Sequence, residues 1–164
     1  MTASPEPARL RAKPSETILY GGLIAGVLDG LDAFIFYNLA YGVPVALLFQ
    51  HIASGLLGKK SFDMGAATVA LGVFLQLFIA VGAAAFYWLI SSFVVDLLRR
   101  PYIYGPLFGL GLFYFMQHVV LPVSRVHQRT TPMSAGELID QLLSHALLVG
   151  LPIALMARRS ARNH

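Results

Sequence analysis

Four long apolar runs dominate this chain of 164 residues and restrict the folds that are open to it. An α-helix rises about 1.5 Å per residue, so about 20 apolar residues cross a hydrocarbon core of about 30 Å. In lipid every backbone polar group must be satisfied internally, and such a run achieves this as a helix. The sequence therefore predicts an all-α polytopic membrane bundle with four transmembrane helices, at residues 17–40, 64–94, 102–121 and 135–156.

The composition and the charge point to the same environment. Only 12% of the residues are charged and 57% are hydrophobic, whereas a soluble domain carries about 25% charged residues. The net charge of +4 comes from arginines and lysines at the ends of the apolar runs, which indicates membrane topology rather than nucleic-acid binding. The lipid bilayer is the expected partner, and no nucleic-acid partner is expected.

The segments outside the four runs complete the predicted organisation. Residues 1–16 combine prolines with mixed charges and are predicted to form a disordered cytoplasmic tail. Residues 17–157 form the transmembrane domain, and residues 158–164 form a basic cytoplasmic tail. Residues 44–57 follow a helix-start proline and end at Gly58. About 14 residues of helix cover only about 21 Å, so this segment is predicted to be a short re-entrant or interfacial helix on the outer side.

The lysines and arginines predict the orientation. Four spans place both termini on the same side of the membrane, and positive residues accumulate on the cytoplasmic side. With the N-terminus inside, eight of the 12 lysines and arginines are cytoplasmic. The other four are Lys59, Lys60, Arg125 and Arg129. The prediction is a multi-pass protein of the bacterial inner membrane with both termini in the cytoplasm.

Glycines recur at four-residue spacing in the first and third runs. Gly22, Gly26 and Gly30 form two overlapping GxxxG motifs, and Gly105 and Gly109 repeat this spacing. Small residues at this spacing let helix backbones approach closely in lipid. The pattern favours packing within a compact bundle. The alternative is that the Gly22/Gly26/Gly30 face binds a second copy or another membrane protein.

Asp29 and Asp32 are the costly residues of the first run. On an insertion scale each central Asp costs roughly 2.5–3.5 kcal/mol, and each Leu, Ile, Phe or Val returns about 0.3–0.6 kcal/mol. The run contains eleven of these apolar residues, so the two sums nearly cancel. The helix therefore needs its neighbours, and both carboxylates are expected to face the bundle rather than lipid.

Further polar residues fall at a similar depth. At about 1.5 Å per residue, Gln76, His118 and His145 lie at middle to outer depth in their runs. His51 lies on the short outer helix, and Glu137 and Gln141 continue a polar stripe that ends at His145. The structural alternative is that these groups only hydrogen-bond one another within the bundle. The candidate polar cluster consists of Asp29, Asp32, His51, Gln76, His118 and His145.

No motif in the sequence indicates catalysis. There is no His-Glu-x-x-His zinc signature, no P-loop and no Gly-x-Ser-x-Gly, and the chain has no cysteine. We therefore predict a protein that is not an enzyme, with no catalytic residues, no metal site and no cofactor. A haem held by His118 and His145, or a divalent metal held by both and Asp32, is a weaker alternative. The two histidines differ in depth by about 7 Å, which argues against a flat bis-His haem.

Several stretches together resemble a group of uncharacterised bacterial inner-membrane proteins with four helices, loosely the YagU-like proteins. These stretches are residues 22–29 (GLIAGVLD), 50–58 (QHIASGLLG), 65–72 (GAATVALG), 119–124 (VVLPVS) and 145–155 (HALLVGLPIAL). The resemblance implies a cell-membrane location and four helices, and it implies no reaction and no catalytic residues. It also leads us to expect a histidine in the middle of the second helix, where this chain has Gln76.

These features predict an integral membrane protein whose Asp/His/Gln cluster binds a small polar ligand or cation, or helps to conduct protons. The alternative is a structural or assembly partner of another membrane protein, which would dock on the Gly22/Gly26/Gly30 face. Metal or haem binding is the weakest of the three hypotheses.

Overall fold

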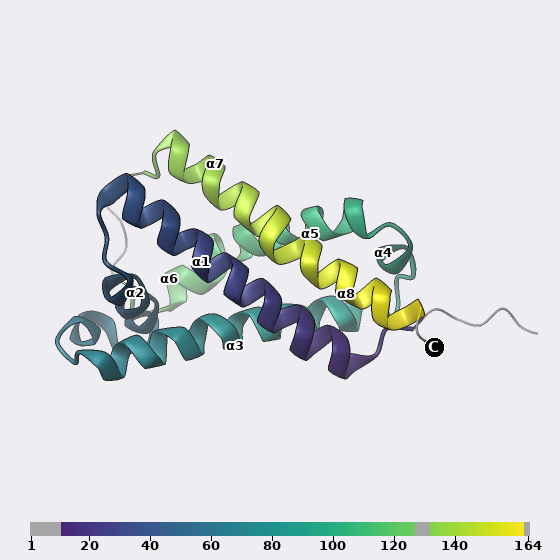
Figure 1. The fold of residues 1–164 in the computed structure, drawn as a ribbon, viewed down its shortest axis with the longest axis horizontal. Coiled ribbons are helices and arrows are strands. Elements are labelled where there is room, and N and C mark those ends of the chain that lie inside the picture. The colour runs from purple at the N-terminus through teal and green to yellow at the C-terminus, as the bar shows by residue number, and fades with distance from the viewer. Residues whose placement is uncertain (1–10, 127–131, 163–164) are drawn as a thin grey trace, which may run out of the picture.

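The computed structural model describes residues 11–126 and 132–162, and it confirms the all-α fold class. Four helical segments, each long and apolar enough to cross a membrane, run side by side in one bundle (Figure 1). No strand occurs among the described residues. The prediction of a helical bundle with four candidate spans is therefore correct.

The first half of the chain contributes two spans and a short helix between them. The first span joins a π-helical segment, η1 (Glu16–Gly21), to α1 (Gly22–Tyr41). The second span is α3 (Ala66–Ser91). Between them lie α2 (Val45–Leu57) and a 3₁₀ segment, η2 (Gly58–Phe62). In Figure 1, α2 is seen almost end-on while α1 and α3 run across the view, so α2 lies across the direction of the spans.

The second half contributes the other two spans. A short helix, α4 (Asp96–Arg99), connects α3 to the third span. The third span consists of α5 (Pro101–Phe115), the π-helical η3 (Met116–Val120) and α6 (Leu121–Val123). The fourth span consists of α7 (Ala135–Ser144), the π-helical η4 (His145–Gly150) and α8 (Leu151–Arg162).

Both of the later π-helical segments end two residues before a proline. Pro122 follows η3 and Pro152 follows η4, each near the start of the next α-helical element. A proline cannot donate to the carbonyl four residues earlier, and its ring clashes with that carbonyl. The sequence predicts that Pro152 frees the carbonyl near Leu148. The chain accommodates this by widening the preceding turn to a π-helix, and the helix then continues.

The ends of the domain extend beyond the predicted helices. The fourth helix was expected to end near Met156, but it runs to Arg162 because Ser160 and Ala161 are buried in the bundle. At the other terminus, residues 11–15 belong to the tail predicted to be disordered, yet Ala12 is buried and its carbonyl accepts from Trp88 Nε1 at 2.9 Å. Residues 1–10 and 163–164 of the two predicted tails lie outside the described residues.

The start and the end of the described chain meet at one end of the bundle. The backbone N–H of Lys13 donates to Ser160 Oγ at 3.1 Å, and the hydroxyls of Thr17 and Ser160 are 3.1 Å apart. In Figure 1 the first turns of the first span and the end of α8 accordingly lie together. Lys13 and Ser160 therefore lie at the same end of the bundle, as an even number of spans requires.

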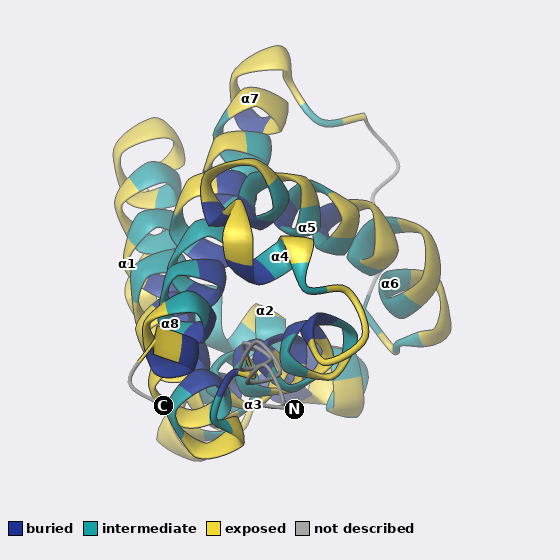
Figure 2. Ribbon diagram, turned by 90° about the vertical axis from the view of Figure 1, so that its right-hand side faces the viewer, coloured by how far each residue is buried: buried dark blue, intermediate teal, exposed yellow. Residues whose placement is uncertain are grey.

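The surface and the core are arranged as expected for lipid. Large apolar side chains are exposed on every span, among them Leu31, Phe78, Leu107 and Leu147. The residues that turn inward are mostly small, and Figure 2 shows them as the dark blue inner faces of the helices. A soluble monomer rarely exposes such an apolar surface, whereas small buried residues are typical of packed membrane helices.

The glycine face of α1 is used inside the chain. A Cβ added at Gly22 would lie 2.6 Å from Val81 Cα, and one added at Gly26 would lie 2.9 Å from Ala80 Cβ. Gly30 faces Gln76, whose Cγ would be 3.7 Å away. The face therefore packs on α3, as the favoured interpretation predicts. In this structure α3 thus occupies the face that the alternative assigns to a second copy or another membrane protein.

The glycines of α5 allow an equally close approach to η4. A Cβ added at Gly109 would overlap the carbonyl oxygen of His145, and one added at Gly105 would lie 2.9 Å from Ala154 Cβ. Gly150 approaches α5 from the opposite side, with the Gly105 carbonyl against it. The backbone of His145 is therefore held directly against α5.

We expect Gly109→Ala to destabilise the protein by about 1–3 kcal/mol or more, because the new methyl group cannot fit against the His145 carbonyl. Gly111→Ala is the matched control in the same helix. Its Cβ would meet no atom of the described residues within 4 Å, and alanine is the better helix former by up to about 1 kcal/mol. The melting temperatures of both variants are measured in detergent by thermal unfolding, with circular dichroism as the signal. Equal melting temperatures for the two variants would contradict this packing.

Candidate functional site

Asp29 lies where three helices meet, near the middle of the first span. Gln76 Nε2 on α3 donates to Asp29 Oδ2 at 2.7 Å. Ser144 Oγ at the end of α7 donates to Asp29 Oδ1 at 3.0 Å. Each carboxylate oxygen thus receives a hydrogen bond from a different neighbouring span. Asp29 therefore faces the bundle, as its insertion cost predicts.

The close approach of α1 to α3 explains why Gln76 reaches the carboxylate. Gly26 and Gly30 carry no side chain on the face toward α3, so the two backbones lie near each other and Gln76 extends over Gly30. A larger residue at either position would push α3 away. The same glycines that pack the helices therefore set the Asp29–Gln76 distance.

Three further carboxylates lie near Asp29 where α1 faces α7: Asp32, Glu137 and Asp140. Asp140 on α7 lies within electrostatic range of Asp32, Asp29 and Glu137. The Oδ2 atoms of Asp32 and Asp140 are buried and have no hydrogen-bond partner among the described residues. The four carboxylates therefore form one acidic group at the interface between α1 and α7.

Glu137 is the most deeply buried of these acids, with 1% of its surface exposed. Its Oε1 accepts from the Tyr37 hydroxyl at 2.6 Å, which ties the end of α1 to the start of α7. The Glu137 N–H donates to Ser134 Oγ at 3.2 Å, so Ser134 caps α7 as the spacing of the two residues predicts.

A polar cavity of about 270 Å³ opens beside Asp29. It reaches from α1 and α3 to α2, η3 and the fourth span, and apolar side chains fill the spaces between its polar groups. The polar residues that line it are Asp29, Tyr37, His51, Gln76, Gln117, Ser124, Gln141 and His145. Of the predicted cluster, the structure therefore brings Asp29, His51, Gln76 and His145 together.

The orientation of His145 follows from its own helix. Its Nδ1 lies 2.9 Å from the Gln141 carbonyl oxygen, and because a carbonyl only accepts, Nδ1 carries the proton. The ring also makes an edge contact with Phe113, with 5.4 Å between centroids. In the neutral ring Nε2 is then left as an acceptor. His51 lines the same cavity from α2. The backbone of α2 at Phe49 can lie close to α3 because α3 has a glycine, Gly72, at the point of contact.

The structure places two predicted members outside the cavity lining. His118 is exposed on η3, its Nδ1 donates to the Tyr114 carbonyl at 3.0 Å, and its ring stacks on Tyr114. Asp32 lies instead within electrostatic range of Asp140 on α7. The depth estimate gave the height of His118 along its helix, but it could not give the direction of the side chain around the helix. Within the described residues, no three His, Asp or Glu side chains are arranged to hold a metal ion.

Sequence reasoning missed Asp140, Ser144 and Tyr37. The available signal was spacing, because Glu137, Asp140 and Ser144 stand at i, i+3 and i+7 and so share one face of a helix. The stripe of Glu137, Gln141 and His145 is the neighbouring face. Glu137 and Ser144 bond residues of α1, whereas Gln141 and His145 line the cavity.

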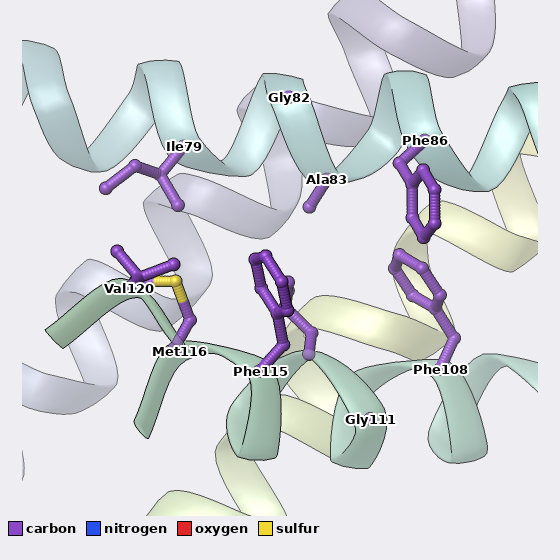
Figure 3. A pocket seen from close by; sticks show the side chains of 10 residues that line it. Ile79, Gly82, Ala83, Phe86, Phe108, Gly111, Phe115, Met116 and Val120 are labelled. Carbon is purple, nitrogen blue, oxygen red and sulfur yellow. The ribbon is translucent and has the colours of Figure 1, made fainter. Parts of the chain in front are cut away.

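A second, larger cleft of about 660 Å³ lies between α3 and the third span. Figure 3 shows Phe86 and Ala83 on α3 facing Phe108 and Phe115 on α5, with no polar side chain among the labelled residues. Four residues line both this cleft and the polar cavity: Ile79, Leu112, Met116 and Val120. They form an apolar wall between the polar cavity and a surface suited to lipid chains.

Four apolar spans, an apolar exposed surface and a polar interior define the chain as a multi-pass α-helical membrane protein. Comparison with protein-family models, with curated proteins and with solved structures finds no match. The likeness to YagU-like proteins is therefore carried by the quoted stretches alone and stays a prediction.

We expect Gln76→Leu to destabilise the protein by about 1–3 kcal/mol, because Asp29 Oδ2 loses its donor and stays partly buried. Gln117→Leu is the matched control. Gln117 lines the same cavity, and no hydrogen bond of its side chain is found among the described residues. Chemical unfolding in mixed micelles gives the free energy of unfolding of each variant. An equal loss of unfolding free energy in the two variants would show that the Gln76–Asp29 hydrogen bond does not stabilise the protein specifically.

Proposed function

We propose that this protein is a non-enzymatic membrane protein whose polar cavity binds a small cation or a small, positively charged polar ligand. The observation that carries the proposal is the lining of the cavity. One carboxylate, two imidazoles and three carboxamides converge there near the middle of the spans. Intramembrane ionisable groups are costly, and they commonly mark ligand or ion sites.

The charge and the size of the cavity support this ligand class. Asp29 is the only carboxylate that the described residues contribute to the lining, and Gln76 and Ser144 hold both of its oxygens in place. Drug-sized pockets run from roughly 300 to 1,000 Å³, so a cavity of about 270 Å³ suits a smaller ligand. Asp29 would supply the counter-charge, while the amides and imidazoles would hydrogen-bond the ligand.

Proton conduction is a second candidate, and the acidic group favours it. Asp29 borders the cavity and also lies within electrostatic range of Asp140, which in turn lies near Asp32 and Glu137. Chains of carboxylates and histidines are the usual components of intramembrane proton relays. In this hypothesis Asp29 connects the acids between α1 and α7 to the cavity.

The setting of this activity is part of the proposal. The excess of positive residues at the end that carries the termini supports a cytoplasmic location for both termini. We place the protein in a bacterial inner membrane on the basis of its resemblance to the YagU-like proteins. Because α3 occupies the glycine face of α1, assembly with a second copy or another membrane protein would have to use another surface.

The test compares Asp29→Asn with Asp32→Asn in proteoliposomes. For a ligand site, Asp29→Asn should reduce binding or flux of Na⁺, K⁺ or methylammonium at least about tenfold, since the only carboxylate of the lining is neutralised. Asp32→Asn should leave it near the wild-type level. Fluorescent ion indicators measure cation flux, and an internal pH dye measures proton flux.

The same pair of variants separates the two candidates. Loss of proton flux in both variants, without any cation response, favours the relay through the acidic group. If wild-type protein shows no binding or flux of any of these cations or of protons, both candidates fail. Circular dichroism of each variant establishes that the helices are intact.

A further inference from the structure

A basic hollow lies at the end of the bundle that carries the termini, far along the spans from Asp29. It occupies about 550 Å³ between the last turns of α8 and the first turn of α5. The side chains that line it are Tyr102, Leu155, Arg158, Arg159 and Arg162. Three guanidinium groups from one helix thus share a concave surface with a tyrosine from another span.

The positive charge of the hollow is not balanced within the described residues. The ion pairs found there join Lys13 to Glu16 and Arg99 to Asp96, and neither involves an arginine of α8. No carboxylate belongs to the lining. Arg100 lies next to α4, which packs on α8, and it adds further positive charge at this end. An anion would relieve the repulsion among these groups.

Interaction with the helix dipole explains only part of this arrangement. Cations near a helix C-terminus are stabilised by the macrodipole, which accounts for arginines in the last turns of α8. It does not account for a hollow that also includes Tyr102 on a different span. Guanidinium groups match the geometry of phosphate oxygens, and basic pockets between membrane helices suit phosphate-bearing headgroups.

We infer that this hollow binds the phosphate headgroup of an anionic lipid in the leaflet on the side of the termini. The hollow lies at the ends of two spans, which is the level of the headgroups in a bilayer. Leu155 lines its inner side, and Tyr102, Ile103 and Leu107 are exposed along the first turns of α5. A lipid whose phosphate sits on the arginines can therefore lay its chains on this apolar strip, which free phosphate cannot use.

The experiment uses the full chain in detergent and compares the triple variant Arg158→Gln/Arg159→Gln/Arg162→Gln with the wild type. Its matched control, Lys59→Gln/Lys60→Gln/Arg125→Gln, also removes three positive charges. Lys59 and Lys60 belong to η2 and the Arg125 N–H donates to the Gly55 carbonyl of α2, and Figure 1 shows α2 at the opposite end of the bundle from the end of α8. Each protein is titrated with phosphatidylglycerol, phosphatidylcholine and inorganic phosphate. Native mass spectrometry counts bound lipids, and thermal shift follows stabilisation.

Phosphatidylglycerol should bind to and stabilise the wild type and the control variant. The α8 variant should bind it roughly a hundredfold more weakly, because each arginine near an anionic surface contributes about fivefold. Should the α8 variant not fold, the single exposed substitution Arg159→Gln should still weaken binding about fivefold.

Three results would overturn the inference. One is equal binding of phosphatidylglycerol by the two triple variants, which would mean unspecific charge attraction. Another is equal stabilisation by phosphatidylcholine, and the third is equal stabilisation by inorganic phosphate without retained lipid. None of these outcomes bears on Asp29, so the cation site stands or falls separately.

Discussion

The hydrogen bonds to Asp29 are the interaction around which the bundle is arranged. A carboxylate in the middle of an apolar span must find donors inside the protein, and here Gln76 and Ser144 supply them from two other spans. The Gln76 bond can form because Gly26 and Gly30 bring α1 against α3. The helix that carries Asp29 thus also carries the glycine face that brings Gln76 within reach of it.

Close backbone contact then divides the interior into parts with different chemistry. Gly109 lets η4 approach α5, and Gly72 lets α2 approach α3, so His145 and His51 border the cavity beside Asp29. Ile79 and Met116 belong to the apolar wall between that cavity and the cleft that faces lipid. The arginines of α8 lie at the end of the spans, where charge can meet headgroups. Asp29, Gln76 and His145 are therefore enclosed at mid-span, while the arginines of α8 lie at the end of the bundle.

Particular residues show how far the sequence could be interpreted. The insertion cost of Asp29 correctly predicted that it faces the bundle, and depth correctly paired it with Gln76. The same depth argument failed for His118, because a one-dimensional estimate gives height along a helix but not direction around it. Ser144 and Asp140 were overlooked because a serine and an acid near a helix end are ordinary residues until their neighbour is known.

The sequence by itself determined that the chain forms four membrane-crossing helices, because run length and apolar content depend only on local composition. It also determined that glycines would be packing surfaces. Only the tertiary structure decided which helix each glycine face meets, which polar residues share a cavity, and that α8 and α5 form a basic hollow. The physical reason is that lipid is uniformly apolar, so it stabilises any apolar helix and does not determine which helices pack together. Shape and hydrogen bonding between distant segments select the packing partners.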